Sequence, residues 1–276
     1  MEWVEFLRVA RVPASGEIVH ARGGFAEPAG GGGVAAVALA RLAGRATLYT
    51  ALGDDALGHR CADELERRGV RVEAVWREKP QRRAVTFLDD AGERTITVIG
   101  ERVAPAASDA LRWEELGACD AVFATAGDAE ALRAARCARV LVATPRIGPS
   151  LIESAVELDA LVHSTTDAGE RYAPGDLHPP PRLVVGTAGA AGGTYTNAEG
   201  VSGAWQATEL PGAVADAYGA GDSFAAGLTF GLAAGLSVDD AVELAARCGA
   251  ACVSGTGPYG AQLDPAVLAS LLRASD

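Results

Sequence analysis

Short apolar segments alternate with helical segments between residues 104 and 186, and this alternation constrains the fold more than any other feature. The expected strands are Ala121–Ala124, Val140–Ala143, Ala160–His163 and Leu183–Val185, with helices expected at Ala129–Arg136 and Leu151–Glu157. Strands that are separated by helices predict a parallel sheet with helices on both of its faces. Ligands of such sheets bind at the carboxyl ends of the strands. The sequence therefore predicts an α/β protein whose site lies at one edge of the sheet.

The flanking regions extend this architecture on both sides. Further helices are expected from the glycine run Gly30–Gly33 through Leu42, and at Ala62–Arg68, Phe224–Ala234, Val238–Cys252 and Pro265–Arg273, with strands at Thr47–Ala51 and Val70–Trp76. Ser237 and Asp240 resemble a capping box at the start of one helix. Because nothing marks a linker, residues 1–276 are predicted to form a single domain.

Two pairs of alternating segments stand outside the strand–helix pattern. One pair is Val4–Val12 with Glu17–Ala21, and the other is Ala84–Leu88 with Arg94–Ile99, joined by the turn sequence Asp89-Asp90-Ala91-Gly92. Together these segments, about 4–21 and 84–99, are expected to form a small sheet that acts as a lid over the active site. The apolar inner face of so small a sheet is too limited for stability alone, which predicts a homodimer through the lid.

Composition and missing motifs exclude several classes of function. The net charge of −12 argues against a nucleic-acid partner, which requires a basic face. Lys79 is the only lysine and Pro80 follows it, so the chain holds no G-x-x-x-x-G-K-[ST] phosphate loop. The four histidines show no H-E-x-x-H spacing, and no G-x-S-x-G elbow is present. The expected partner is a small molecule.

The chain carries no charge-free apolar run of transmembrane length, and its start lacks the basic residues of a signal peptide. We therefore expect a cytoplasmic protein with no membrane association. The five cysteines, Cys61, Cys119, Cys137, Cys248 and Cys252, are interpreted as reduced thiols, in keeping with that compartment.

The stretch Asp216–Phe224 holds the strongest chemical signal. Gly219 and Gly221 allow a tight backbone turn, and a helix is expected from Asp222 onward. The first N–H groups of a helix lack partners and favour an anion such as a phosphate. Asp222 would stand beside that phosphate and accept a proton from an attacking hydroxyl. The simpler alternative is that Asp222 only caps the helix.

The same stretch resembles the D-T-x-G-A-G-D-x-F signature of the ribokinase family, also called the PfkB carbohydrate kinases. Gly53-Asp54-Asp55-Ala56-Leu57-Gly58 resembles the family's G-D-D-x-x-G turn, Thr187–Gly192 its T-x-G-x-x-G stretch, and Gly260-Ala261 its C-terminal G-A. The resemblance implies a ribokinase-like fold with a central, mostly parallel sheet and a β lid. It also implies an ATP-dependent kinase that phosphorylates a hydroxyl of a sugar or related polyol, with Mg²⁺ and a candidate K⁺ requirement.

The resemblance assigns roles to individual residues. Asp222 is expected as the catalytic base, with the N–H groups of Gly219, Ala220 and Gly221 as an anion hole. The expected nucleotide-side residues are Thr187, Gly189, Gly192, Gly255, Gly257 and Gly260. The expected substrate-side residues are Glu5, Gly30, Gly31, Gly32, Gly33 and Arg94, with Asp222. Asp167, in place of the Glu of the family's N-x-x-E motif, and Asp216 are the expected metal residues.

Departures from the family pattern keep two alternatives open. Val34 falls where the family has a sugar-binding Asn, Ser164 replaces the Asn of N-x-x-E, and Glu5 is the nearest acidic residue to the missing first-strand Asp. One alternative is a nucleoside kinase. The other is a member of the same fold that binds sugar or nucleotide with little turnover, in which the glycine run only packs a helix and Asp167 is an ordinary loop residue.

Overall fold

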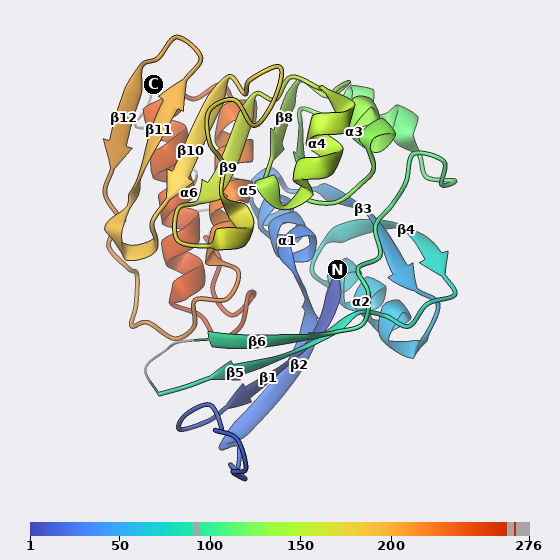
Figure 1. Ribbon diagram of the computed structural model, residues 1–276, viewed down its shortest axis with the longest axis vertical. Helices are drawn as coiled ribbons and strands as arrows, with labels where there is room; N and C mark the ends of the chain where they lie inside the picture. Colours follow the sequence, from blue (N-terminus) through green and yellow to red (C-terminus); the bar gives the residue numbers. More distant parts are fainter. Residues whose placement is uncertain (91–93, 264–267, 269–276) are drawn as a thin grey trace.

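The computed structural model describes residues 1–90, 94–263 and 268, and its centre is a six-stranded sheet (Figure 1). The strand order is β12 (Ser202–Trp205), β11 (Gly193–Asn197), β10 (Leu183–Thr187), β9 (Ala160–Ser164), β8 (Val140–Ala143) and β7 (Ala121–Ala124). The four strands from β7 to β10 run parallel, as the sequence predicts, and β11 and β12 add an antiparallel edge that it did not predict.

Helices cover both faces of this sheet. Alternate residues of one strand point to opposite faces, so Val140 and Val142 of β8 pack with α5 (Ala220–Ala233) and α6 (Val238–Val253). Leu141, which lies between them, packs with α3 (Ala129–Ala135) and α4 (Gly148–Ser154) on the other face. Figure 1 shows α3 and α4 in front of the sheet and α5 and α6 behind it. The parallel sheet is therefore buried between two layers of helices.

The N-terminal part contributes α1 (Gly31–Ala43) and a separate parallel pair, β3 (Ala46–Gly53) and β4 (Val70–Arg77). The helix between them, α2 (Ala56–Arg67), begins six residues before the expected Ala62. Its start is fixed by Asp55, whose carboxylate accepts the backbone N–H groups of Leu57 and Gly58. Within the described residues, the shorter 3₁₀ helices are η1 (Trp113–Ala118), η2 (Pro145–Ile147), η3 (Ala168–Glu170) and η4 (Gly189–Ala191).

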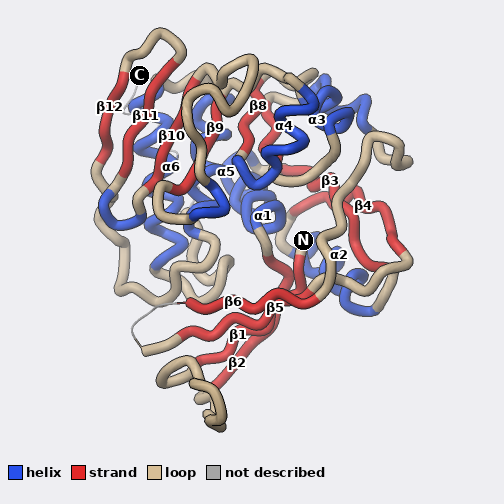
Figure 2. The backbone as a smooth tube through the Cα atoms, viewed as in Figure 1, coloured by secondary structure: helices blue, strands red, loops and turns tan. Residues whose placement is uncertain are grey.

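A four-stranded sheet lies beneath α1 (Figure 2). Its order is β2 (Gly23–Ala29), β1 (Glu2–Arg8), β5 (Arg83–Leu88) and β6 (Arg94–Ile99). The expected strand at Glu17–Ala21 is wrong, because that segment is a loop and the second strand follows it at β2. The loop is exposed, with Ile18 at 89%, whereas Phe25 of β2 stacks on Phe6 of β1 at 4.6 Å between ring centroids. Aromatic packing favours the later segment despite its glycines and proline.

Several other expected boundaries shift. Helix α5 begins at Ala220, two residues before Asp222, and α4 begins at Gly148, three residues before Leu151, with Pro149 in its first turn. The expected turn at residues 89–92 and the expected helix Pro265–Arg273 lie largely outside the described residues. Among the described helices, none combines the length and apolar character needed to cross a membrane.

Candidate active site

A large cavity opens where the four-stranded sheet faces the carboxyl ends of the parallel strands. The connected space has a volume of about 2570 Å³ and continues past α1 and α5 to Asp120 and Arg139, at the opposite ends of β7 and β8. The polar or glycine positions that line it include Gly30, Gly31, Gly32, Arg94, Thr125, Ser164, Thr187 and Asp222. This part of the cavity lies at the edge of the sheet where the sequence predicts ligand binding.

The start of α5 forms one wall of the cavity. Gly219 has a φ of +82°, and a Cβ there would come within 2.9 Å of the Val34 side chain, so glycine is required. The N–H of Ala220 already donates to the Ala217 carbonyl at 3.4 Å. In the described part of the chain, the N–H groups of Gly221 and Asp222 have no backbone acceptor. The N–H of Gly219 has no backbone acceptor there either, so two of the three predicted anion-binding groups have no backbone partner, and Asp222 adds a third.

The carboxylate of Asp222 lies between the N-termini of two helices. A Cβ on Gly31, the first residue of α1, would come within 2.8 Å of the Asp222 carboxylate oxygen. Burial, and then the charge of Glu170, raise the pKa of Asp222 to about 6, while Arg146 and Arg94 act in the opposite direction. A carboxylate with a pKa near 6 is well matched to proton transfer near neutral pH.

Asp216 supports the loop that leads into α5. Its side chain is buried, and its two carboxylate oxygens accept the N–H groups of Tyr218 at 2.8 Å and Gly257 at 3.0 Å. These bonds join the loop before α5 to the turn at residues 254–260. In the described ranges, no three His, Cys, Asp or Glu side chains gather in a group that could hold a metal ion. Asp216 thus braces the loop that leads into α5.

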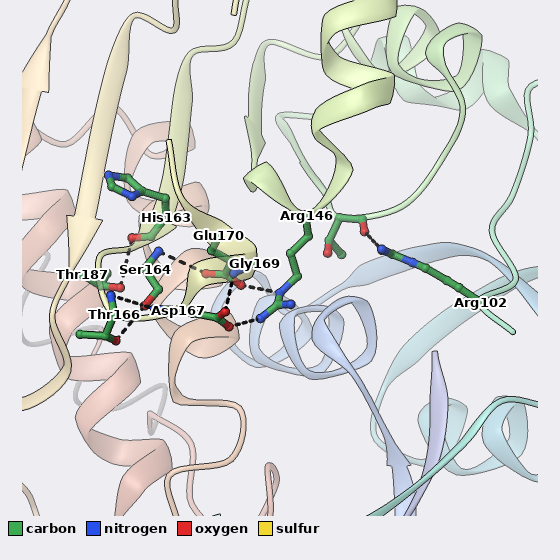
Figure 3. Close-up of polar contacts among 10 residues, drawn as sticks. Arg102, Arg146, His163, Ser164, Thr166, Asp167, Gly169, Glu170 and Thr187 are labelled. Atoms are coloured by element: carbon green, nitrogen blue, oxygen red, sulfur yellow. Dashed lines mark hydrogen bonds and ion pairs between the residues drawn. The ribbon is translucent and has the colours of Figure 1, made fainter. Parts of the chain in front are cut away.

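Arg146, which follows β8, binds two carboxylates in the cavity wall. It donates to Asp167 at 2.6 Å and to Glu170 at 2.5 Å (Figure 3). The other oxygen of Asp167 accepts the Gly169 N–H at 2.8 Å, so this carboxylate starts η3 as well as pairing with Arg146. Ser164 accepts the Asp167 N–H at 3.1 Å. The predicted Ser164–Asp167 segment therefore reaches the cavity, but its carboxylate is already engaged within the protein.

Two of the six predicted nucleotide-side residues line the cavity, and four do not. Thr187 and Gly189 line the cavity at the end of β10. Gly192, Gly255, Gly257 and Gly260 lie outside the lining, and packing explains their identity. A Cβ would meet backbone within 2.1 Å at Gly192 and Gly255 and within 2.3 Å at Gly260, and the Glu27 carboxylate within 2.5 Å at Gly257.

Most of the predicted substrate-side residues line the cavity, and two of them, Glu5 and Gly33, do not. Gly30, Gly31 and Gly32 line the cavity, whereas Gly33 lies against the Met1 sulfur. Glu5 is outside the lining and pairs with Arg83 at 3.4 Å, so its placement as a sugar ligand is corrected. Glu2 lines the cavity instead, three residues earlier on β1 and 3.5 Å from Arg82.

Comparison with known proteins tests the family resemblance that the sequence motifs suggest. The model of the pfkB family carbohydrate kinases matches residues 7–148 and 150–264. The chain belongs to this family. A fructokinase from Vibrio alginolyticus is 35% identical over 92 residues, a match that covers 33% of this chain and only 29% of that relative's length. The family resemblance and the ribokinase-like fold class, both predicted from the sequence, are confirmed.

Solved structures with the fold of this carbohydrate-kinase family match almost the whole chain. A ribokinase from Thermotoga maritima superposes with a TM-score of 0.77 at 18% identity, covering 99% of this chain and 96% of that one. A ribokinase from Arabidopsis thaliana, complexed with ribose and ATP, gives a TM-score of 0.75 at 19% identity, with coverage of 99% and 96%. At such identities the likeness demonstrates the fold.

Several cavity residues of this family member were missed by the sequence analysis. Thr125, Arg102, Arg146 and Glu170 all line the cavity, and Arg102 donates to the Thr125 carbonyl. Thr125 directly follows β7, and Arg146 lies close behind β8. The rule that ligands meet the carboxyl ends of parallel strands would have found both of them, if applied to the first polar residues after each expected strand.

Proposed function

We propose that this protein is an ATP-dependent kinase that phosphorylates a hydroxyl of a sugar or related polyol. The observation that carries the proposal is the Asp222 carboxylate, set between the glycine-rich starts of α1 and α5 with a pKa raised to about 6. A base between two sets of free backbone N–H groups suits a reaction that combines a hydroxyl with a phosphoryl group. Membership of a carbohydrate-kinase family supports the same reaction.

In the proposed reaction, an Asp222 carboxylate oxygen accepts the proton of the acceptor hydroxyl. The hydroxyl oxygen forms a bond to the γ-phosphorus of ATP, the bond from that phosphorus to the bridging β–γ oxygen breaks, and ADP leaves. The N–H groups of Gly221 and Asp222 stabilise charge on the transferred phosphoryl group. Thr187 and Gly189 form the nucleotide side of the cavity.

Mg²⁺ would neutralise charge on the phosphates. Such an ion is commonly bound through one or two carboxylates, water and phosphate oxygens, so it needs no closed cage of protein ligands. The carboxylates of Asp167 and Glu170 line the cavity but already accept bonds from Arg146 and from backbone N–H groups. They would orient water ligands of the ion only through the second lone pairs of these oxygens. Asp216 fits a metal less well, because its oxygens accept two backbone N–H groups, and we assign it to bracing the loop. A requirement for K⁺ is tested by measuring turnover with and without this ion.

The test is ATP consumption across a panel of sugars, polyols and nucleosides with Mg²⁺, with and without K⁺. Phosphorylation of a sugar or polyol, abolished in Asp222→Asn, is the expected result. Preferred turnover of a nucleoside would establish the nucleoside-kinase alternative. Calorimetric binding of a sugar or ATP without turnover of any acceptor would establish the binding-protein alternative.

We also propose a homodimer through the four-stranded sheet. Ile96, Val98 and Ile99 of the edge strand β6 are 43%, 43% and 41% exposed, which places apolar side chains beside the unpaired backbone groups of an edge strand. Ile96 and Val98 also line the cavity, so a second chain packed on this strand would cover part of its opening. An exposed apolar edge strand commonly pairs with or packs against a second chain.

The proposed location is the cytoplasm. All five cysteines are free, which supports a reducing, cytoplasmic location.

A further inference from the structure

The charges around the cavity are unequally paired. Arg82 lies 3.5 Å from Glu2, and Arg146 is bonded to both Asp167 and Glu170. Arg102 also lines the cavity, but its guanidinium donates to the neutral carbonyl of Thr125. Within the described ranges, no carboxylate forms an ion pair with Arg102. Arg94 and Arg45 of the lining also form no ion pair within those ranges, and Arg94 donates to the neutral carbonyl of Ala217. Arg102 is thus one of three cavity arginines without an acidic partner, and the one bonded to Thr125 at the end of β7.

The surroundings of Arg102 are themselves cationic. Partial burial, followed by the positive charges of Arg82 and Arg146, lowers the pKa of Arg102, and Glu2 offsets part of this effect. Figure 3 shows Arg102 approaching from the side opposite to Asp167 and Glu170, with Arg146 between them in this view. The guanidinium remains protonated, since even a lowered arginine pKa lies far above neutrality. An anion bound at Arg102 would relieve this repulsion and gain charge-assisted hydrogen bonds.

Arg102 lies on the substrate side of the cavity rather than the nucleotide side. Its partner Thr125 directly follows β7, whereas Thr187 ends β10. Two strands, β8 and β9, separate these positions in the sheet. Three inter-strand spacings amount to about 14 Å. A Cβ on Gly31 would lie 2.8 Å from the Asp222 carboxylate and 3.5 Å from the Thr125 hydroxyl, so Thr125 and the base face the same glycine, and Arg102 is bonded to a residue beside the proposed place of the acceptor hydroxyl.

We propose that the acceptor is an anionic sugar, carrying a carboxylate or a phosphate group that Arg102 binds at the β7 end of the cavity. The proposal rests on the proposed kinase function and specifies its acceptor. The planar guanidinium presents paired N–H donors that suit either a carboxylate or a phosphate. The transferred hydroxyl then lies at the other end of the acceptor, beside Asp222.

The experiment compares matched acceptors: neutral sugars, the corresponding sugar acids and the corresponding sugar monophosphates. Steady-state turnover and calorimetric binding are measured for the parent, Arg102→Ala, Arg102→Lys and Arg247→Ala. Arg247 pairs with Glu243 on α6 and is a surface control outside the cavity lining. Circular dichroism and melting temperature confirm that each variant is folded.

We expect one class of anionic sugar to bind and turn over best, and the class that does so distinguishes carboxylate from phosphate. Arg102→Ala should weaken binding of that acceptor by roughly ten- to a hundredfold, mainly in KM. Arg102→Lys should restore part of the loss. The KM for ATP and the parameters for neutral sugars should not change, and Arg247→Ala should match the parent.

Three outcomes would overturn the proposal. These are a preference for neutral sugars in both binding and turnover, equal effects of Arg102→Ala and Arg247→Ala on the anionic acceptor, or an effect of Arg102→Ala confined to the KM for ATP. Failure of the kinase function is a different result: anionic sugars would bind in an Arg102-dependent manner while no acceptor received phosphate from ATP. The binding measurement therefore tests the anion site even without turnover.

Discussion

At the scale of single residues, the charge of Asp222 should destabilise the folded protein. Its pKa rises from 3.8 to about 6, so the folded chain binds a proton more readily than the unfolded chain in that interval. Stability should therefore fall as the pH rises from about 4 to 6, with the full cost, at most about 3 kcal/mol, present above this window. Asp222→Asn, which removes the charge, should raise the melting temperature at pH 7.5.

The increase in melting temperature should shrink as the pH falls and approach zero near pH 3, about one unit below the unfolded pKa of 3.8, where Asp222 is largely protonated in both states. Thermal unfolding of parent and variant across this range gives the measurement. Each kcal/mol corresponds to about 2–4 °C for a chain of this size. A constant difference at all pH values would show that the effect does not come from titration of this carboxylate.

The same substitution should cost activity. A general base contributes roughly 10²–10⁴-fold in rate, about 3–5 kcal/mol of barrier, so kcat of Asp222→Asn should fall by that factor. Nucleotide affinity should persist, because backbone N–H groups rather than the side chain bind the phosphate. In the parent, kcat/KM should decline as the pH falls below about 6, when Asp222 becomes protonated. Turnover of the variant within tenfold of the parent would assign the base elsewhere.

The residues of the site differ in how far the sequence could predict them. Gly219 and Asp222 are local signals, since a glycine turn before a buried helix is readable within nine residues. Arg146 could have been found from its place just after the expected strand Val140–Ala143. Arg102 could not, because its relation to the cavity depends on a bond to the Thr125 carbonyl, 23 residues away in the sequence. Glu5 was chosen because it is the nearest acidic residue to the position of the missing first-strand Asp. Glu2 and Glu5 are three residues apart on β1, so they point to opposite faces of the sheet, and the structure places Glu2 on the cavity side.

At the scale of elements, the meeting of α1 and α5 makes glycine necessary at position 31. A Cβ there would lie 2.8 Å from the Asp222 carboxylate, so Gly31→Ala should displace the base and lower kcat/KM by at least about tenfold. Gly148→Ala is the matched control, since a Cβ at the start of α4 meets no atom within 4 Å. Equal activity of the two variants would contradict the proposed position of Asp222.

The elements themselves were predicted best where periodicity and capping agree. Helix α6 begins after Ser237, whose hydroxyl accepts the Asp240 N–H, as the capping box predicts. Strand β2 was missed because its glycines and Pro28 are residues that strands disfavour. It is stabilised by Phe25, which stacks on Phe6 of a different strand. Such partners are distant in the sequence, so no local pattern reveals them.

At the scale of the whole molecule, the β6 edge should control association. If Ile96, Val98 and Ile99 lie in a dimer contact, Val98→Asp should place a charge within it and produce a monomer at micromolar concentration. Ile152→Asp is the control, because Ile152 is 61% exposed on α4, far from β6 in the sequence. Light scattering distinguishes the two species. A parent that is already monomeric would rule out this dimer.

The segment that carries Arg102 bears on how readily mutation can alter the acceptor preference of the protein. Residues 100–112 run between β6 and η1 without forming a helix or strand. Insertions and substitutions in such a connection leave the core of the sheet intact. The base and the phosphate-binding N–H groups, by contrast, belong to α5 and are fixed by its packing. Acceptor preference should therefore be the trait that laboratory selection alters most readily, through exchange of this one connection while phosphoryl-transfer chemistry is retained.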